Sequence, residues 1–130
     1  MKYLREYTEK PMAEMLDKNG AIFAFGTEQF NEKKVEGVKY VKMGMGLVAP
    51  KENAKTIWNE TDRIHKEGII QDMKEHSKAK IIQRECANYE IQYGDSEPVY
   101  DALKEYPITR KEIDKGIEKF IQYCIKHDMY

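Results

Sequence analysis

The sequence has few of the features that crosslink a small protein or anchor it in a membrane. Cysteine occurs only twice, as Cys86 and Cys124, and we expect both to be buried thiols in a reducing cytoplasm. The longest apolar run, Ala21 to Phe25, is far too short to cross a bilayer, and no apolar segment follows the first methionine. We therefore expect no signal peptide, no association with a membrane and a cytoplasmic location.

A strong net charge of either sign is also missing. The chain has 22 Lys and Arg residues against 23 Asp and Glu, so its net charge of -1 creates no field that would draw it to nucleic-acid phosphates. Charged residues nevertheless make up 35% of the 130 residues, and hydrophobic residues 41%. This balance predicts a densely charged surface around a hydrophobic core, with residues 1–130 forming a single domain.

Ligand motifs for metals and phosphates are lacking as well. Neither a His-x-x-x-His nor a Cys-x-x-Cys pattern occurs, and His65 and His76 would lie about 16 Å apart along one helix. Gly44-x-Gly46 stands between a strand and a helix, but no Gly-Lys-Ser/Thr follows, and Pro50 delays the helix that a dinucleotide fingerprint requires. We predict no metal and no cofactor, and interpret the two glycines as a tight turn or bulge between paired strands.

Hydrophobic periodicity in the N-terminal part predicts a small sheet. Thr8 is placed to cap a helix that has Pro11 in its first turn and ends at Asn19-Gly20. Ala21 to Phe25 has the pattern of a strand that is apolar on both faces and hence buried. Further elements are predicted as a short helix at 28–33 and as strands at 38–42 and 47–49.

The remainder of the chain predicts helices. Apolar residues recur at intervals of three and four from Pro50 to about His76, which makes this the longest element. Ser77 is placed to cap the next helix, which Gly94 closes, and Thr109 with Glu112 forms a capping box for the last one. The fold class is therefore α+β, with a small antiparallel sheet in the N-terminal third packed against a mostly helical C-terminal two-thirds. The expected core cluster consists of Phe23, Phe25, Tyr40, Trp58, Ile82 and Phe120.

Polar residues concentrate on the helix that precedes Gly94. We interpret Arg84, Glu85, Asn88 and Glu90 as a structural polar network that holds local structure. A carboxylate pair such as Glu85 and Glu90 runs acid–base chemistry only if two different environments separate the two pKa values. An enzyme centred on Glu85, Asn88 and Glu90 is the alternative, and a deep pocket that holds both carboxylates would favour it.

The last two predicted helices imitate a helix-turn-helix. A recognition helix would present Arg110, Lys111 and Lys115 near its N-terminus. However, Glu112 and Asp114 interleave with these basic residues and would also face phosphates. We therefore favour an ordinary helical hairpin. A small nucleic-acid-binding regulator that uses this hairpin is kept as an alternative function, which a contiguous basic stripe on the surface would support.

Two blocks of the sequence carry a recognisable pattern. They comprise Gly20 to Glu32, Lys39-Tyr40-Val41, Gly44, Gly46 and Pro50 to Asn53, followed by Glu85, Asn88-Tyr89-Glu90 and Tyr93-Gly94-Asp95. In these blocks the chain resembles a family of small proteins from phages and mobile elements of gut bacteria. Tyr89 stands where that family usually has histidine, and Gly94 where it has threonine, which argues for a structural or binding role.

The resemblance implies an accessory protein of a phage or mobile element, a category that includes anti-CRISPR proteins. We therefore expect a non-enzymatic protein that binds a host protein in the bacterial cytoplasm, and in particular an inhibitor of a type II CRISPR nuclease. Aromatic and basic groups are frequent anchors of protein interfaces, so the candidate partner-binding residues are Tyr3, Arg5, Tyr7 and Tyr130. The sequence leaves the molecular target and the oligomeric state open.

Overall fold

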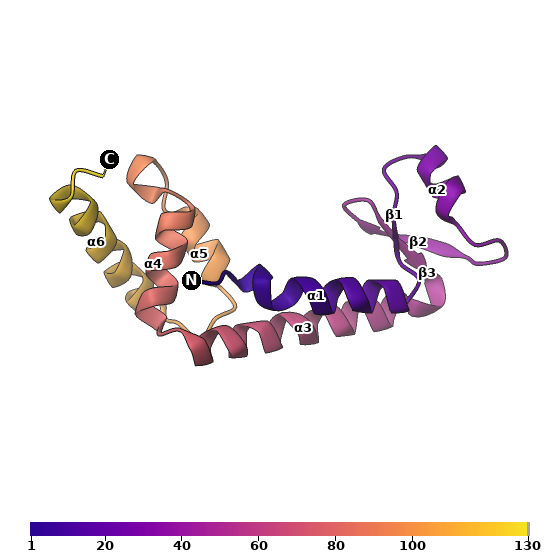
Figure 1. Ribbon diagram of the computed structural model, residues 1–130, viewed down its shortest axis with the longest axis horizontal. Coiled ribbons are helices and arrows are strands. Elements are labelled where there is room, and N and C mark those ends of the chain that lie inside the picture. Colours follow the sequence, from indigo (N-terminus) through magenta and orange to yellow (C-terminus); the bar gives the residue numbers. More distant parts are fainter. Residues whose placement is uncertain (130) are drawn as a thin grey trace. The chain divides into compact units, whose positions relative to one another are not determined.

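The structure, a computed structural model, describes residues 1–129, and Tyr130 lies outside the described residues (Figure 1). The predicted α+β class is confirmed, because a small antiparallel sheet lies in the N-terminal part and helices make up the C-terminal part. Among residues 1–129, no helix is long and apolar enough to cross a bilayer. The elements follow in the order α1 (Leu4–Lys18), β1 (Ile22–Phe23), α2 (Thr27–Lys33), β2 (Tyr40–Gly44), β3 (Leu47–Pro50), η1 (Lys51–Asn53), α3 (Ala54–Glu75), α4 (Lys78–Asn88), η2 (Ile91–Tyr93), α5 (Glu97–Leu103) and α6 (Arg110–Lys126).

The chain divides into two compact units, and the division falls within α3. The sheet unit comprises Lys2–Gly68, and the helical unit comprises Met1 and the residues from Ile69 onward. Each unit buries apolar side chains of its own, such as Ile57 in the sheet unit and Ile81 in the helical unit. That residues 1–130 form a single domain stays a prediction.

The sheet has three antiparallel strands in the order β1-β3-β2. A two-residue turn of Met45 and Gly46 joins β2 to β3, and both residues have a positive φ, 52° and 79° respectively. Positive φ at both central residues is the signature of the type I′ turn, whose twist matches that of the paired strands. The interpretation of Gly44-x-Gly46 as a turn between paired strands is confirmed.

The core of the sheet unit lies between the sheet, α1 and α3. α1 runs alongside α3 (Figure 1) and approaches it closely at Gly68, where an added Cβ would lie 2.6 Å from Thr8 Cγ2. A side chain at position 68 would therefore force Thr8, or the helix that carries it, to shift. The buried cluster consists of Met15, Ala49, Ile57 and Ile64, with Met12, Leu16, Ala21 and Met43 packed against it.

The predicted core is wrong for the two phenylalanines of the first strand. Phe23 is 50% exposed and Phe25 is 77% exposed. The run from Ala21 to Phe25 was expected to be buried on both faces, but β1 has only two residues and lies at an edge of the sheet. A short edge strand has no neighbour on its outer side, so Phe25 beyond its end is left in contact with solvent.

Trp58 is also wrongly placed in the predicted core, since it is 58% exposed. It follows the buried Ile57 directly, and successive residues of a helix are turned by about 100°. Trp58 therefore points away from the face that Ile57 and Ile64 bury. Ile82 and Phe120 are buried as predicted, but they belong to the helical unit, so the six residues do not form one cluster.

The first helix begins before the predicted cap, Thr8. Tyr3 is its N-cap: the Tyr3 N–H donates to Glu6 Oε2 at 2.6 Å, and the Glu6 N–H donates to the Tyr3 carbonyl at 3.0 Å. Pro11 consequently lies in the helix interior and not in the first turn. Leu4 and Tyr7 are three residues apart and both lie near Gly68 of α3, so they extend the apolar stripe of the helix, and the assignment of the cap to Thr8 overlooked them.

In the helical unit, α4 packs against both α5 and α6 (Figure 1). Gly116 of α6 faces Ile82 of α4 so closely that an added Cβ would lie 2.4 Å from Ile82 Cγ2. The absence of a side chain at Gly116 is therefore what lets the two helix backbones approach each other.

The predicted caps of α4 and α6 are confirmed. Ser77 Oγ accepts the backbone N–H of Lys80 at 3.2 Å, and Thr109 Oγ1 accepts that of Glu112 at 3.1 Å. The predicted end of α4 at Gly94 is wrong. The helix stops at Asn88 and is followed by η2, a single 3₁₀ turn.

Candidate functional site

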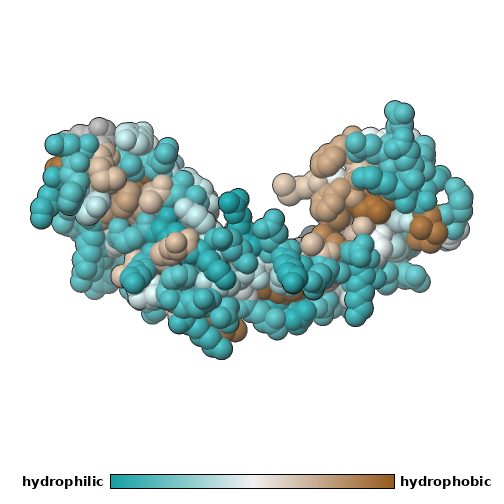
Figure 2. All heavy atoms as spheres, in the orientation of Figure 1, coloured by the Kyte–Doolittle hydropathy of each residue, from teal (hydrophilic) through white to brown (hydrophobic). Residues whose placement is uncertain are grey.

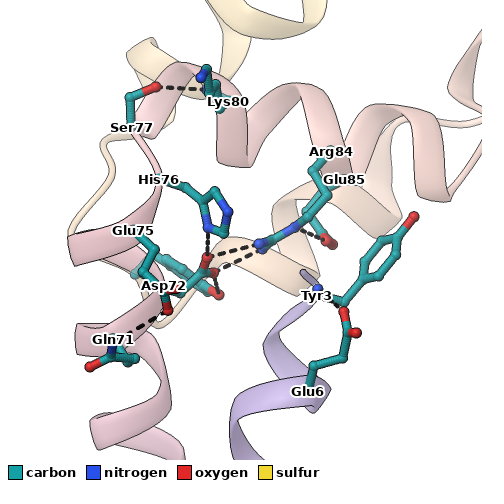
Figure 3. A network of polar contacts seen from close by, with 11 residues as sticks. Tyr3, Glu6, Gln71, Asp72, Glu75, His76, Ser77, Lys80, Arg84 and Glu85 are labelled. Atoms are coloured by element: carbon teal, nitrogen blue, oxygen red, sulfur yellow. Dashed lines mark hydrogen bonds and ion pairs between the residues drawn. The ribbon is translucent and has the colours of Figure 1, made fainter. Parts of the chain in front are cut away.

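A buried network of charged and polar side chains joins three parts of the helical unit (Figure 3). Asp72 of α3 is fully buried and accepts two hydrogen bonds from Arg84 of α4, 2.9 Å from Nη1 to Oδ1 and 3.0 Å from Nη2 to Oδ2. Tyr106, which follows α5, donates its hydroxyl to Asp72 Oδ2 at 2.6 Å, and His76 Nδ1 lies 2.9 Å from Asp72 Oδ1. Arg84 Nε also donates to Glu85 Oε1 at 3.1 Å. These five residues are called the Asp72 network below.

Three groups of the Asp72 network, those of Asp72, Arg84 and Tyr106, keep fixed protonation states at neutral pH. Burial raises the pKa of Asp72, but the hydrogen bonds from Arg84, Tyr106 and His76 outweigh burial and bring this pKa below its usual 3.8. Burial raises the pKa of Tyr106, and its bond to the Asp72 carboxylate raises it further. Burial lowers the pKa of Arg84, but its bonds to Asp72 outweigh burial, so this pKa is raised. Asp72, Arg84 and Tyr106 can therefore clamp helices together, and these three groups are poorly suited to exchange protons.

Two of the four residues of the predicted polar network lie in the Asp72 network. Arg84 and Glu85 are buried and hydrogen-bonded to each other. Asn88 and Glu90 are exposed, at the last residue of α4 and in the turn that follows it. A shared structural role of all four residues stays a prediction.

Sequence reasoning missed Asp72, although the sequence contained a signal for it. Asp72 lies four residues after Gly68 and three after Ile69, so it falls on the buried face of α3. A carboxylate on an otherwise apolar face needs a charged or hydrogen-bonding partner. Tyr106 carries no comparable signal, because its contact with Asp72 spans 34 positions of the sequence.

The two thiols are buried in the helical unit, as predicted. Burial raises the pKa of Cys86 to about 12, and the nearby Glu85 and Cys124 add to the shift. A thiol with such a pKa is protonated at neutral pH and is a poor nucleophile or metal ligand. Within the described part of the chain, no three His, Cys, Asp or Glu side chains are grouped so that they could hold a metal ion.

An open cleft lies in the sheet unit, beside the hairpin of β2 and β3. Its volume is about 610 Å³, and its walls are the β1–α2 loop, α2 and the hairpin itself. Its charge is slight, since Lys42 is the only charged side chain among the described residues that line it. This cleft is called the hairpin cleft below. Its larger lining side chains are Phe25, Phe30, Tyr40, Lys42, Met45 and Leu47.

The rim of the hairpin cleft exposes large apolar side chains. Phe25 is 77% exposed, and Met45 at the tip of the turn is 95% exposed. The Phe25 ring lies against Gly46, where an added Cβ would be only 2.5 Å from Phe25 Cε1. Figure 2 shows apolar surface gathered over the sheet region. A cluster of exposed apolar side chains around a cleft is typical of an interaction site.

The walls of the hairpin cleft are held in place by specific contacts. The Phe25 N–H donates to Gln29 Oε1 at 2.9 Å, which ties the β1–α2 loop to α2. The rings of Phe30 and Tyr40 meet edge to face with centroids 5.3 Å apart, and the Val35 N–H donates to Tyr40 Oη at 3.0 Å. The cleft is therefore formed by the fold itself, as ligand sites usually are.

The structure does not bring the predicted partner-binding residues to the hairpin cleft. Arg5 is exposed on α1, and Tyr3 is the half-buried N-cap of that helix. Tyr7 is half-buried, and Lys2 Nζ lies 5.1 Å from the centroid of its ring. Tyr130 lies outside the described residues. A role of these four residues in partner binding stays a prediction.

The candidate recognition helix for nucleic acid is partly occupied by contacts within the helical unit. Arg110 lies over the ring of Tyr100, 4.2 Å from its centroid, and the Tyr100 hydroxyl donates to Asp114. Lys111 and Lys115 are exposed. Carboxylates interleave with these basic groups, so α6 does not present a basic stripe at its N-terminus.

The fold and the hairpin cleft define a small α+β protein with a preformed apolar site. The chain belongs to a protein family described as a family of unknown function (DUF7659), which it matches over residues 4–123. This match includes both the Asp72 network and the hairpin cleft. No curated protein and no solved structure matches the chain.

Proposed function

We propose that this chain is a protein-binding accessory protein, which acts by occupying the surface of a partner and without catalytic turnover. The observation that carries the proposal is the hairpin cleft, where Phe25 and Met45 are exposed on walls that other contacts hold in place. Exposed aromatic and methionine side chains are enriched at protein interfaces. An apolar cleft of this kind gains stability when a partner covers it.

The chemistry of the polar groups supports a binding role over catalysis. The carboxylate of Asp72 is engaged by Arg84, Tyr106 and His76, and the Cys86 thiol is buried with a raised pKa. The hairpin cleft offers Lys42 and a tyrosine hydroxyl, but among its described lining residues there is no carboxylate or histidine to act as a general base.

The narrower proposal is an inhibitor of a type II CRISPR nuclease, made by a phage or mobile element and acting in the cytoplasm of the bacterial host. It rests on the resemblance of two sequence blocks to small accessory proteins of phages and mobile elements. The first of these blocks, Gly20 to Asn53, contributes the walls of the hairpin cleft.

The test is a titration of the purified protein against a type II CRISPR nuclease loaded with guide RNA and target DNA. We expect cleavage to stop at a fixed molar ratio, with the nuclease left chemically unmodified. Met45→Glu should abolish the inhibition because it puts a charge at the tip of the cleft. Ile70→Glu is the matched control, since Ile70 is 56% exposed but does not line the cleft.

Three results would contradict the proposal in different ways. Inhibition that continues to rise without a fixed ratio would indicate turnover and hence an enzyme. Equal loss of inhibition in Met45→Glu and Ile70→Glu would remove the hairpin cleft from the mechanism. Tighter binding to free duplex DNA at physiological salt than to any nuclease would replace the proposal with the nucleic-acid-binding alternative, in which α6 carries the contacts.

A further inference from the structure

The outer edge of β2 is open to a further strand. In the order β1-β3-β2, β2 pairs with β3 on one side, and no strand of the described chain pairs with its other side. An open edge presents backbone N–H and C=O groups that can pair with a strand from another chain. The hairpin cleft is lined by several residues of the same strand.

The register shows which backbone groups lie on this open edge. Tyr40 is opposite Pro50, which has no N–H, so these two residues form a pair without mutual hydrogen bonds. The neighbouring pair is hydrogen-bonded, because the Lys51 N–H donates to the Lys39 carbonyl at 2.8 Å. Antiparallel ladders alternate between these two kinds of pair. The N–H and C=O groups of Tyr40 and Lys42 therefore point away from β3, along the open edge.

The open edge and the hairpin cleft share residues. Tyr40 and Lys42 supply the outward backbone groups, and their side chains line the cleft. A strand laid along β2 would place alternate side chains on the face where the cleft opens. Main-chain pairing combined with side-chain pockets is the recognition mode of domains that bind extended peptides.

We propose that the hairpin cleft binds an extended segment of a partner protein, which adds to β2 as a fourth strand of the sheet. This inference rests on the proposed protein-binding function and specifies the form of the partner. One apolar side chain of the segment packs against Met45, which follows the end of β2, and an acidic side chain faces Lys42. The acidic residue follows from charge, since Lys42 is the only charged side chain among the described lining residues.

Charge also argues against a second copy of this chain as the occupant. Pairing β2 with β2 of another copy would bring Lys39 and Lys42 of both copies onto one small surface. Like charges on paired strands are destabilising, and lysines on an edge strand are a common defence against self-pairing. A strand with acidic and apolar side chains avoids this repulsion, and its acidic side chains would be attracted by the lysines.

The test begins with a displayed library of random linear peptides, which is selected on the immobilised full-length protein. We expect the enriched peptides to alternate apolar residues and to carry an acidic residue. The best peptide is then synthesised with a fluorophore, and its affinity is measured by anisotropy. Methylation of the backbone nitrogens that face β2 should weaken binding about tenfold, whereas methylation of the alternate nitrogens should leave it unchanged.

Variants of Lys42 separate its backbone from its charge. Lys42→Ala removes the charge and keeps the N–H, whereas Lys42→Pro removes both. Proline is tolerated there because the lost N–H points away from β3. We expect Lys42→Pro to bind at least about tenfold more weakly than Lys42→Ala. Lys42→Glu should prefer a peptide whose acidic residue is changed to lysine, and Lys39→Glu is the control, because Lys39 does not line the cleft.

Several outcomes would overturn the inference. One is that the selection enriches no peptide, and another is that backbone methylation does not change the affinity. The third is that sedimentation velocity shows a dimer of this chain that Lys42→Pro dissociates. If Lys42→Pro does not fold, the methylated peptides still decide the question. A nuclease bound through Met45 with no backbone effect would overturn strand addition and leave the proposed function intact. A peptide bound as expected, without inhibition of any nuclease, would instead remove only the narrower functional proposal.

Discussion

The two units of the chain both expose large apolar side chains, but they differ in whether they bury charges and in whether the exposed apolar groups surround a cleft. The helical unit buries the charged pair of Asp72 and Arg84, whereas the sheet unit exposes Phe25 and Met45. Burying charges costs solvation energy that only good geometry offsets, and exposing apolar groups gives up hydrophobic stabilisation. Each arrangement therefore costs free energy that other contacts must offset. The contacts of Asp72 are satisfied inside the unit, but those of Phe25 and Met45 are incomplete, which is why the proposed function is assigned to the sheet unit.

Among substitutions outside the hydrophobic cores, removing the Asp72 carboxylate should have the largest effect on stability. Asp72→Asn takes the charge of Asp72 away from the buried Arg84 guanidinium, so the free energy of unfolding should fall by about 3 kcal/mol. Urea unfolding followed by circular dichroism measures this loss. The control is Asp62→Asn, which breaks an exposed ion pair with Lys66 and should cost less than about 1 kcal/mol. Equal losses in the two variants would show that the buried network does not hold the helical unit.

Acidic pH should lower the free energy of unfolding of the wild-type protein by part of the amount that Asp72→Asn removes. The folded-state pKa of Asp72 lies below its usual 3.8, so the unfolded chain binds a proton more readily than the folded one. The stabilisation is therefore present above about pH 4 and is lost as the pH falls through the folded-state pKa. Unfolding curves at a series of acidic pH values should show this decline, and Asp72→Asn should lack that part of it. An identical decline in both proteins would assign the acid sensitivity to other carboxyl groups.

Filling the contact between α4 and α6 should have a smaller effect. Gly116→Ala would place a methyl group 2.4 Å from Ile82 Cγ2, and overpacking of this kind costs about 1–3 kcal/mol. Helix propensity alone would favour alanine by about 1 kcal/mol, so the net loss should lie at the low end of that range. Thermal melting measures it. Lys119→Ala is the control, because Lys119 is exposed on the same helix, and it should leave the melting temperature nearly unchanged.

Substitution in the hairpin cleft should have the smallest effect on stability. Met45→Ser removes a side chain that is 95% exposed, so the free energy of unfolding should change by less than about 0.5 kcal/mol. Ile64→Ala, in the core of the same unit, should cost about 2–5 kcal/mol in the same urea titration. A large loss in Met45→Ser would mean that Met45 is part of the core and would weaken the contrast between the two units.

The sequence predicted the fold best where one local pattern decides the structure. Thr109 with Glu112 defines the start of α6, and the glycines beside Met45 define the hairpin turn. Ile82 and Phe120 follow from helical periodicity, which reports the buried face of a helix directly. These features depend on residues within a few positions of one another.

The candidate sites were harder to predict, for two physical reasons. The Asp72 network joins Asp72, Arg84 and Tyr106, which only the packing of three helical segments brings together. Phe25 has the composition of a core residue, so hydrophobicity alone assigns it to the interior. Its exposure depends on β1 ending after two residues, and no local pattern marks that end.

The conformation of Met45 has a consequence for how variants of this protein would fare under selection. A type I′ turn favours asparagine or glycine at that position, because a positive φ strains other side chains by about 1–2 kcal/mol. A library randomised at codon 45 and sorted only for folding would therefore drift toward asparagine and glycine. The same library could instead be sorted for survival of the phage or mobile element that is proposed to encode the protein. That selection would keep methionine if the hairpin cleft carries the function. If the two selections enriched different residues at position 45, this difference would reveal that function constrains that codon, even without an identified partner.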